Sequence, residues 1–207
     1  FGMTVGTKAS SVKFGNSTQN AIFDGVAGSF SYWFKADQLF IESRELLSNI
    51  KGSTGLRTLL MTDGHIRLTG AGMDNQSVHF KTNSAATVGT WHHLVVAWDD
   101  PNGVLKIALD GSTQTQAFSA GALEDPSRLI AGNFSDSDSQ LSTQFDGKLF
   151  DLQMYQGMLS DEDIELLSDN PGSSLSELSI PEPRHYSLLI SLLVMGHLQL
   201  RRRRPAN

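Results

Sequence analysis

The stretch Gly89-Thr90-Trp91-His92-His93-Leu94-Val95-Val96-Ala97-Trp98 carries the strongest strand signal in this chain. Its second half is almost continuously apolar, which is typical of a strand buried on both faces. Asp99–Gly103 then supplies a Pro-Asn-Gly turn, and the alternating segment Val104–Leu109 returns. We expect an antiparallel pair here, ended by a second turn at Asp110-Gly111.

Similar segments lie on both sides of this pair. Ser29–Lys35 alternates Phe30, Tyr32 and Phe34 with Ser31, Trp33 and Lys35, which predicts a strand with two differently filled faces. Residues 58–61 and 65–68 read as a hairpin in which Asp63 and Gly64 supply the positive φ angles of a tight turn. Further short strands are expected at residues 11–14, 20–23, 39–60 in part, 78–81, 129–131 and 147–155.

One short helix follows the last strand. Ser160 with Asp163 three residues later forms a capping arrangement, and Asn170-Pro171-Gly172 ends the helix. We therefore predict an all-β antiparallel sandwich of the jelly-roll type with one short C-terminal helix. The predicted organisation is a sandwich over residues 1–172, a linker over 173–180, and a tail with a short hydrophobic helix over 181–207.

Composition limits the function. Of 207 residues, 39% are hydrophobic and 18% charged, with 19 glycines, which suits a globular domain of short strands and argues against disorder. The net charge is −10 up to residue 180 and +4 after it. An acidic body does not attract nucleic acid, whereas the tail's arginines suit anionic lipids. The absence of cysteine excludes disulfides and a thiol nucleophile.

Four blocks in this order are similar to concanavalin A-like sandwiches of the laminin-G/pentraxin kind: Phe30–Lys35, Gly89–Val95, Leu105–Gly111, and Phe145–Tyr155 ending in Leu159-Ser160. The resemblance covers nearly all of residues 11–168. It implies two curved, stacked antiparallel sheets with one concave face.

A loop rich in oxygen ligands is the best metal candidate. Asn133–Asp138 contains Asp136 and Asp138, and Asp146 follows it. Calcium binds six to eight oxygens from carboxylates, amides and carbonyls, so we expect a calcium site there. The resemblance to pentraxins implies the same position, except that Phe134 stands where that pattern has a second acidic ligand. A solvated acidic turn is the alternative.

The histidines and tryptophans have simpler interpretations. His92 and His93 are adjacent, so they point to opposite faces of a strand and cannot chelate one ion; we expect both to pack or to form hydrogen bonds. His65 and His79 lack a zinc-type partner motif. Trp33, Trp91 and Trp98 could stack on sugar rings, but aromatic side chains in dense strands are usually core.

Catalysis finds little support in the sequence. No strand carries the Glu-x-Asp-x-x-Glu arrangement of sandwich glucanases, and there is no Gly-x-Ser-x-Gly elbow or phosphate-binding loop. The leading hypothesis is a non-catalytic domain that binds glycan or another extracellular matrix component. The alternatives are a glycoside hydrolase or lyase of the same fold, and a surface protein that self-assembles.

The tail has three parts: Pro181-Glu182-Pro183, an apolar run from Tyr186 to Leu200, and Arg201, Arg202, Arg203 and Arg204. The run is shorter than the roughly 20 residues of a spanning helix, and the arginines would hold its end on the cytoplasmic side. An amphipathic helix lying on the domain is the alternative.

The order of these parts resembles a bacterial PEP-CTERM sorting signal. The resemblance implies that an exosortase, a membrane-embedded protease, cuts the tail and that the protein reaches the cell envelope or extracellular polymer. It predicts a secreted protein that is anchored only transiently, with a secretory leader before Phe1.

Overall fold

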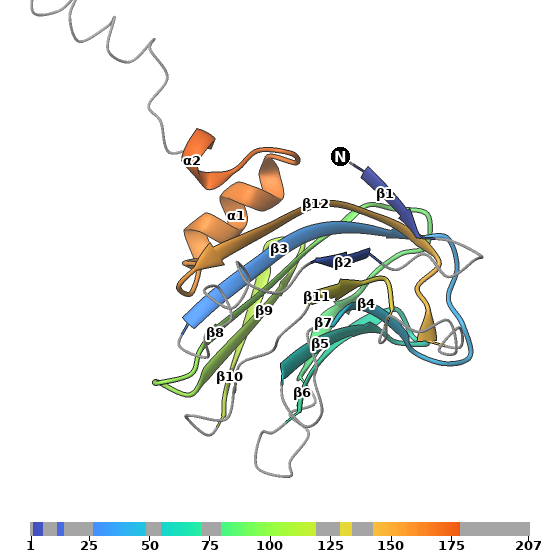
Figure 1. The fold of residues 1–207 in the computed structure, drawn as a ribbon, viewed down its shortest axis with the longest axis horizontal. Helices are drawn as coiled ribbons and strands as arrows, with labels where there is room; N and C mark the ends of the chain where they lie inside the picture. The colour runs from blue at the N-terminus through green and yellow to red at the C-terminus, as the bar shows by residue number, and fades with distance from the viewer. Residues whose placement is uncertain are drawn as a thin grey trace, which may run out of the picture. The chain divides into compact units, whose positions relative to one another are not determined.

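A computed structural model of the chain describes residues 2–5, 12–14, 27–48, 55–71, 80–118, 129–133 and 143–178. The chain divides into two compact units, Phe1–Gly172 and Ser173–Asn207. Among its described residues, the first unit contains two six-stranded sheets whose paired strands are antiparallel, as the sequence predicted. The sheets stack in layers, with the long strands β12 and β3 in one layer and β4 and β5 in the other (Figure 1).

The strands of the first sheet stand in the order β1 (Gly2–Val5), β12 (Gly147–Gln156), β3 (Ala27–Ala36), β8 (His92–Asp99), β9 (Val104–Leu109) and β10 (Ser112–Ala117). Those of the second sheet stand in the order β2 (Val12–Phe14), β11 (Leu129–Ala131), β4 (Arg44–Ser48), β5 (Gly55–Leu60), β6 (His65–Ala71) and β7 (Phe80–Ala85).

The core lies between the two sheets and follows the predicted alternation. On β3, Phe30, Tyr32 and Phe34 are buried among the core side chains, and on β8 Leu94, Val96 and Trp98 join them. The hydroxyl of Tyr32 meets Thr58 Oγ1 of β5 at 2.7 Å, so one buried hydrogen bond connects the sheets. Ser29, Ser31 and Trp33 therefore face the other side of the first sheet, which we call its outer face.

Helix α1 (Asp161–Asp169) covers part of this outer face. Ser160 caps it: the Ser160 hydroxyl accepts from the N–H of Asp163, and the Asp163 carboxylate completes the capping box. Ile164 and Leu167 are its buried residues. Lys106 of β9 donates to the carbonyl of Leu159 and to Asp161. Strand β8 is buried on both faces, as its apolar sequence predicted.

The hairpin between β5 and β6 differs from the expected turn. Gly64 has φ +82°, but Asp63 is not among the residues with positive φ. The N–H of Gly64 donates to the carbonyl of Met61, and the N–H of Met61 to that of His65, which makes a three-residue loop closed by a left-handed glycine. At the β9–β10 turn both Asp110 (φ +51°) and Gly111 (φ +77°) are left-handed, as a two-residue turn requires.

Some other segments differ from what the sequence predicted, and some lie outside the residues that the structure describes. Leu39–Ile41 belongs to no strand. The expected linker contains a one-turn helix, α2 (Leu175–Leu178), where the Glu177 carboxylate accepts from the N–H of Ser174. The predicted strand at 20–23 and the tail from residue 181 fall outside the described residues. Within the described part, no helix has the length and apolar character to cross a membrane.

Candidate functional site

A cluster of aromatic side chains lies on the outer face of the first sheet. Strands β12 and β8 flank β3 on either side. The register places Trp33 of β3 opposite both Phe150 of β12 and His93 of β8. Trp91, two residues before His93, completes the cluster. We call Trp33, Trp91, Phe150 and the neighbouring Lys35 and Lys148 the Trp91 face.

Trp91 is the exposed member of this cluster. Its relative exposure is 40%, whereas Trp98 at 2% is core. The rings of Trp91 and Phe150 meet edge to face with centroids 6.1 Å apart, although they come from opposite sides of β3. The expectation that Trp91 packs in the core is therefore wrong. The alternation of β8 carried the signal, since Trp91 shares the parity of His93 and not that of the core residues Leu94 and Trp98.

Trp33 of this cluster packs on a buried histidine, His93. The ring of Trp33 stacks on His93 at a centroid distance of 5.0 Å. His93 Nε2 meets the hydroxyl of Ser31 at 2.7 Å, and burial lowers the pKa of His93 to about 4. A neutral, fixed imidazole thus holds Trp33 flat on the sheet. Because both Ser31 and His93 are buried, this Ser–His pair is not available to a substrate.

His92 lies on the opposite side of the strand, as predicted, and packs against the core residue Phe34. Its Nδ1 lies 2.7 Å from the Asp110 carboxylate, and its Nε2 accepts from the N–H of Thr87. The hydrogen bond with Asp110 raises the pKa of His92, while burial opposes the rise. Since both ring nitrogens are engaged, His92 anchors the start of β8 and does not offer a free base.

Strand β12 carries a polar chain beside the cluster. A bulge between Phe150 and Gln153 puts Asp151 at φ +55°. The Asp151 carboxylate accepts from Nε2 of Gln153 at 2.8 Å and from the N–H of Gly172 at 3.0 Å. Tyr155 in turn donates to Gln153. Amide and phenol groups thus flank the aromatic cluster.

The second sheet carries a buried charge on the side away from its core residues. Glu45 of β4 is 1% exposed, and its Oε1 accepts from Nη1 of Arg57 at 3.0 Å. The register aligns Glu45 with Leu59 and then with Arg67 on β6. Burial raises the pKa of Glu45 to about 7, although Arg57 and Arg67 oppose the rise. Its Oε2 has no partner among the described residues.

The structure describes only one of the three predicted calcium ligands. Asp136 and Asp138 lie outside the described residues. Asp146 accepts from Nε2 of Gln38 at 2.6 Å. The ends of the loop that carries the two aspartates meet, because Thr143 Oγ1 donates to Asn133 Oδ1 at 3.0 Å. In the described part of the chain, no three His, Asp or Glu side chains are grouped to hold a metal.

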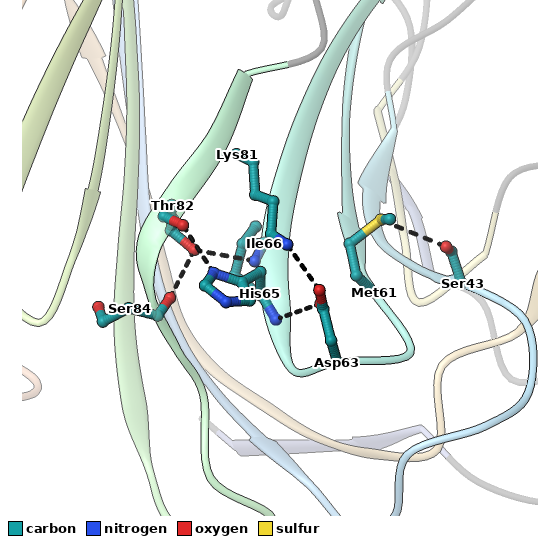
Figure 2. A network of polar contacts seen from close by, with 8 residues as sticks. All are labelled: Ser43, Met61, Asp63, His65, Ile66, Lys81, Thr82 and Ser84. Atoms are coloured by element: carbon teal, nitrogen blue, oxygen red, sulfur yellow. Dashed lines mark hydrogen bonds and ion pairs between the residues drawn. The ribbon is translucent and has the colours of Figure 1, made fainter.

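His65 belongs to a polar network at the β5–β6 turn (Figure 2). Its Nδ1 lies 2.7 Å from the carbonyl oxygen of Thr82 on β7. Asp63 accepts from the N–H of His65 and from Lys81 Nζ, at 3.2 and 2.6 Å. This network ties β7 to the hairpin. His79, the other histidine considered, is outside the described residues.

The residues of the predicted sorting signal, Pro181, Glu182, Pro183 and Arg201–Arg204, also lie outside the described residues.

The chain matches one protein family in sequence and several solved structures in fold. Residues 6–165 match the sequence profile described as the Concanavalin A-like lectin/glucanases superfamily. No curated protein matches the chain. Among solved structures, the chain is similar to a native heptameric SAP-like pentraxin from Limulus polyphemus, with a TM-score of 0.60, 15% identity, and 81% of this chain and 80% of the pentraxin covered.

Two further structures extend the comparison. The botulinum neurotoxin serotype D binding domain aligns with a TM-score of 0.65 and 13% identity over 81% of this chain and 42% of that chain. A putative carbohydrate binding protein from Bacteroides ovatus aligns with a TM-score of 0.55 and 10% identity over 68% and 40%. The chain spans less than half of either protein. At these identities the likeness shows a shared fold.

Proposed function

The chain belongs to the concanavalin A-like lectin/glucanases superfamily, and on that premise we propose that it is a non-catalytic domain that binds glycan through the Trp91 face. The observation that carries the proposal is the exposed ring of Trp91, which packs edge to face against Phe150 on the outer face of the first sheet. Several of the similar structures are named as binding domains, one of them for carbohydrate, which is consistent with a binding role.

The chemistry of the Trp91 face suits a sugar ring. The faces of pyranose rings carry C–H groups that pack on aromatic rings, while their hydroxyls need hydrogen-bond partners. Trp and Tyr supply large, stiff contact area at a small cost in side-chain entropy. The amide of Gln153 and the carboxylate of Asp151 lie on the same strand as Phe150 and provide polar groups beside the rings.

Replacing Trp91 tests the proposal. We expect Trp91→Ala to weaken binding to an insoluble polysaccharide about fivefold to thirtyfold, since stacking on one aromatic ring contributes roughly 1–2 kcal/mol. Val88→Ala is the matched control, because Val88 is an exposed apolar residue (43%) in the turn just before Trp91. A glycan array shows the ligand, and thermal melting shows that both variants fold. Equal binding by Trp91→Ala and the wild type contradicts the proposal.

A glycoside hydrolase is the second candidate, because a carboxyl group with a pKa near 7, such as Glu45, suits a general acid. Retaining hydrolysis needs two carboxyl groups about 5–5.5 Å apart. Glu45 is the sole acidic residue in the six described strands of the second sheet, so a strand-borne partner is missing there. Reducing-sugar release that Glu45→Gln abolishes would favour the hydrolase.

Calcium is part of the proposal as an aid to binding at the loop Asn133–Asp146. The support is that the loop ends are joined by the Thr143–Asn133 hydrogen bond and that Asp146 stands at one of them. A ligand that binds only the native state raises the melting temperature. We expect calcium to do so in the wild type, and less in Asp136→Asn or Asp138→Asn. No shift in the wild type rejects the site.

The tail is proposed as a sorting address for the cell envelope, with Pro181-Glu182-Pro183 recognised by an exosortase and Arg201–Arg204 kept on the cytoplasmic side. The support is the order of these motifs in the sequence. Cell fractionation with a C-terminal epitope tests it. Loss of the epitope from the envelope form is expected, and full-length protein confined to the cytoplasm contradicts it.

A further inference from the structure

Two lysines stand directly opposite each other on the Trp91 face. The register pairs Lys148 of β12 with Lys35 of β3. This pair lies two residues along each strand from the pair Phe150–Trp33, and therefore on the same face of the sheet. Lys35 lies between the core residues Phe34 and Ala36, so its side chain points to the outer face together with that of Trp33. Lys148 is exposed and precedes the core residue Leu149. The two ammonium groups therefore border the aromatic cluster.

Placing Lys35 opposite Lys148 lowers the stability of the sheet, and no ion pair among the described residues offsets this loss. Like charges directly opposite on neighbouring strands destabilise a sheet. In the described part of the chain, the ion pairs involve Arg57, Lys81, His92 and Lys106, and not Lys35 or Lys148. The acidic residues closest in sequence to Lys148 have other partners, since Asp146 accepts from Gln38 and Asp151 from Gln153. The lysine pair is thus open to an anion from outside.

The net charge of the rest of the protein indicates which kind of anion can bind the lysine pair. Up to residue 180 the chain carries 11 Lys and Arg against 21 Asp and Glu, so the body as a whole repels polyanions. A densely sulfated chain would be repelled along most of its length. A glycan with one carboxylate per sugar carries less charge and is repelled less, and it can place one carboxylate on the lysine pair while the ring of that sugar stacks beside it on Trp91.

We propose that the Trp91 face selects uronic-acid glycans, with Lys35 and Lys148 binding the sugar carboxylate. This inference rests on the proposed function, because it names the ligand class of the same site. Charge-assisted hydrogen bonds are roughly twice as strong as neutral ones, and each lysine donates through an ammonium group. The lysines provide selectivity for the carboxylate, and the aromatic rings bind the sugar whether it is charged or neutral.

The experiment compares three soluble probes against the full chain: polygalacturonate, the same polymer with its carboxyl groups reduced to alcohols, and dextran sulfate. We expect the wild type to bind polygalacturonate about tenfold more tightly than the reduced polymer at low salt, and the difference to shrink as salt screens the charges. Lys35→Gln with Lys148→Gln should remove the difference in affinity between polygalacturonate and the reduced polymer. Lys81→Gln, which removes one positive charge from β7, is the control. It should keep the difference in affinity between the charged and the reduced polymer.

The outcomes separate this inference from the proposed function. Loss of binding to both galacturonan forms in Trp91→Ala, together with loss of the preference for the charged form in the lysine variant, supports both. Equal wild-type binding to the charged and reduced polymers overturns the uronate inference and leaves glycan binding standing. Tighter binding to dextran sulfate than to polygalacturonate also overturns it. A wild type that binds none of the probes counts against both.

Discussion

The Asp110 carboxylate receives hydrogen bonds from two consecutive residues of β8, from Nδ1 of His92 at 2.7 Å and from the N–H of His93 at 2.9 Å. The carboxylate reaches both because Asp110 sits in the left-handed region, at φ +51°, in the β9–β10 turn. One aspartate thus joins the turn to the start of the neighbouring strand. Burial would raise the pKa of Asp110, but the hydrogen bonds from His92 and His93, together with the electrostatic attraction of these two histidines, lower it.

We predict that Asp110→Asn destabilises the protein more at pH 5 than at pH 8. Asparagine tolerates the left-handed backbone, so the turn is kept and only the charge is lost. The pKa of His92 is raised in the folded state, so its contribution is full below the unfolded pKa of 6.5 and disappears as pH rises through the folded value. Because Asp110 is half-exposed, we expect an effect of about 1 kcal/mol at pH 5.

Urea unfolding of both proteins at the two pH values measures this difference. His65→Gln is the control, because the ring of His65 is bound to the carbonyl oxygen of Thr82 and not to a carboxylate. An equal loss of stability at both pH values would show that the charge of His92 is not coupled to Asp110.

Glu45→Gln should make the protein more stable at neutral and alkaline pH. The pKa of Glu45 is about 7 when folded and 4.5 ordinarily, so on raising the pH the unfolded chain ionises first. The wild type therefore loses stability between about pH 4.5 and 7, by up to roughly 3 kcal/mol, and glutamine does not titrate. Unfolding free energies measured from pH 4 to pH 8 should separate progressively over that interval.

The matched control is Glu165→Gln, which removes a carboxylate from an exposed position on α1. In this variant the fall in stability between about pH 4.5 and 7 should remain, because Glu45 is still present. If the Glu45→Gln curve runs parallel to that of the wild type, Glu45 is ionised throughout and its ion pair with Arg57 dominates over burial.

Gly64→Ala should destabilise the fold more than Gly89→Ala. Both glycines are left-handed, with φ of +82° and +79°. A Cβ on Gly64 would stand 2.7 Å from the carbonyl oxygen of Ala86, whereas a Cβ on Gly89 meets nothing within 4 Å. Gly89→Ala should cost about 1 kcal/mol from the backbone alone, and Gly64→Ala about 3 kcal/mol because β7 must also shift. Melting temperatures compare the two, and equal losses would mean that β7 yields freely.

Tyr32→Phe and Thr58→Val test the hydrogen bond between the sheets. Each single change leaves one buried hydroxyl without this partner, at a cost of about 1–3 kcal/mol. The double variant removes both groups, so its loss should be smaller than the sum of the single losses by about 1 kcal/mol. Additive losses in chemical denaturation would show that the two hydroxyls are not coupled.

Much of the fold could be predicted from local sequence. The alternation of Phe30, Tyr32 and Phe34 gave the core side of β3, and the apolar half of β8 indicated burial on both faces. Ser160 and Asp163 marked the start of α1, three residues apart and bonded to each other. These features depend on neighbours within a few positions, so the residues that decide them are adjacent in the sequence.

The conformation of the turn at Asp63 could not be predicted from the local sequence. The sequence Asp63-Gly64 suggested a two-residue turn, but Asp63 instead accepts from Lys81, eighteen positions away on β7, and only Gly64 takes the positive φ. The cross-strand partner, which the turn sequence does not contain, stabilises the longer loop.

The sequence by itself determined the alternating strands, the positions of the turns and the helix cap, because backbone geometry and nearest neighbours dictate them. The tertiary structure decided which strand faces remain uncovered. Trp91 and Trp98 belong to one apolar stretch, yet one is exposed beside Phe150 and the other is buried in the core. Burial depends on what packs across the sheet from distant parts of the chain: strand register joins Trp33 to Phe150 and Lys35 to Lys148, more than a hundred residues apart. The candidate site exists only once that register is formed.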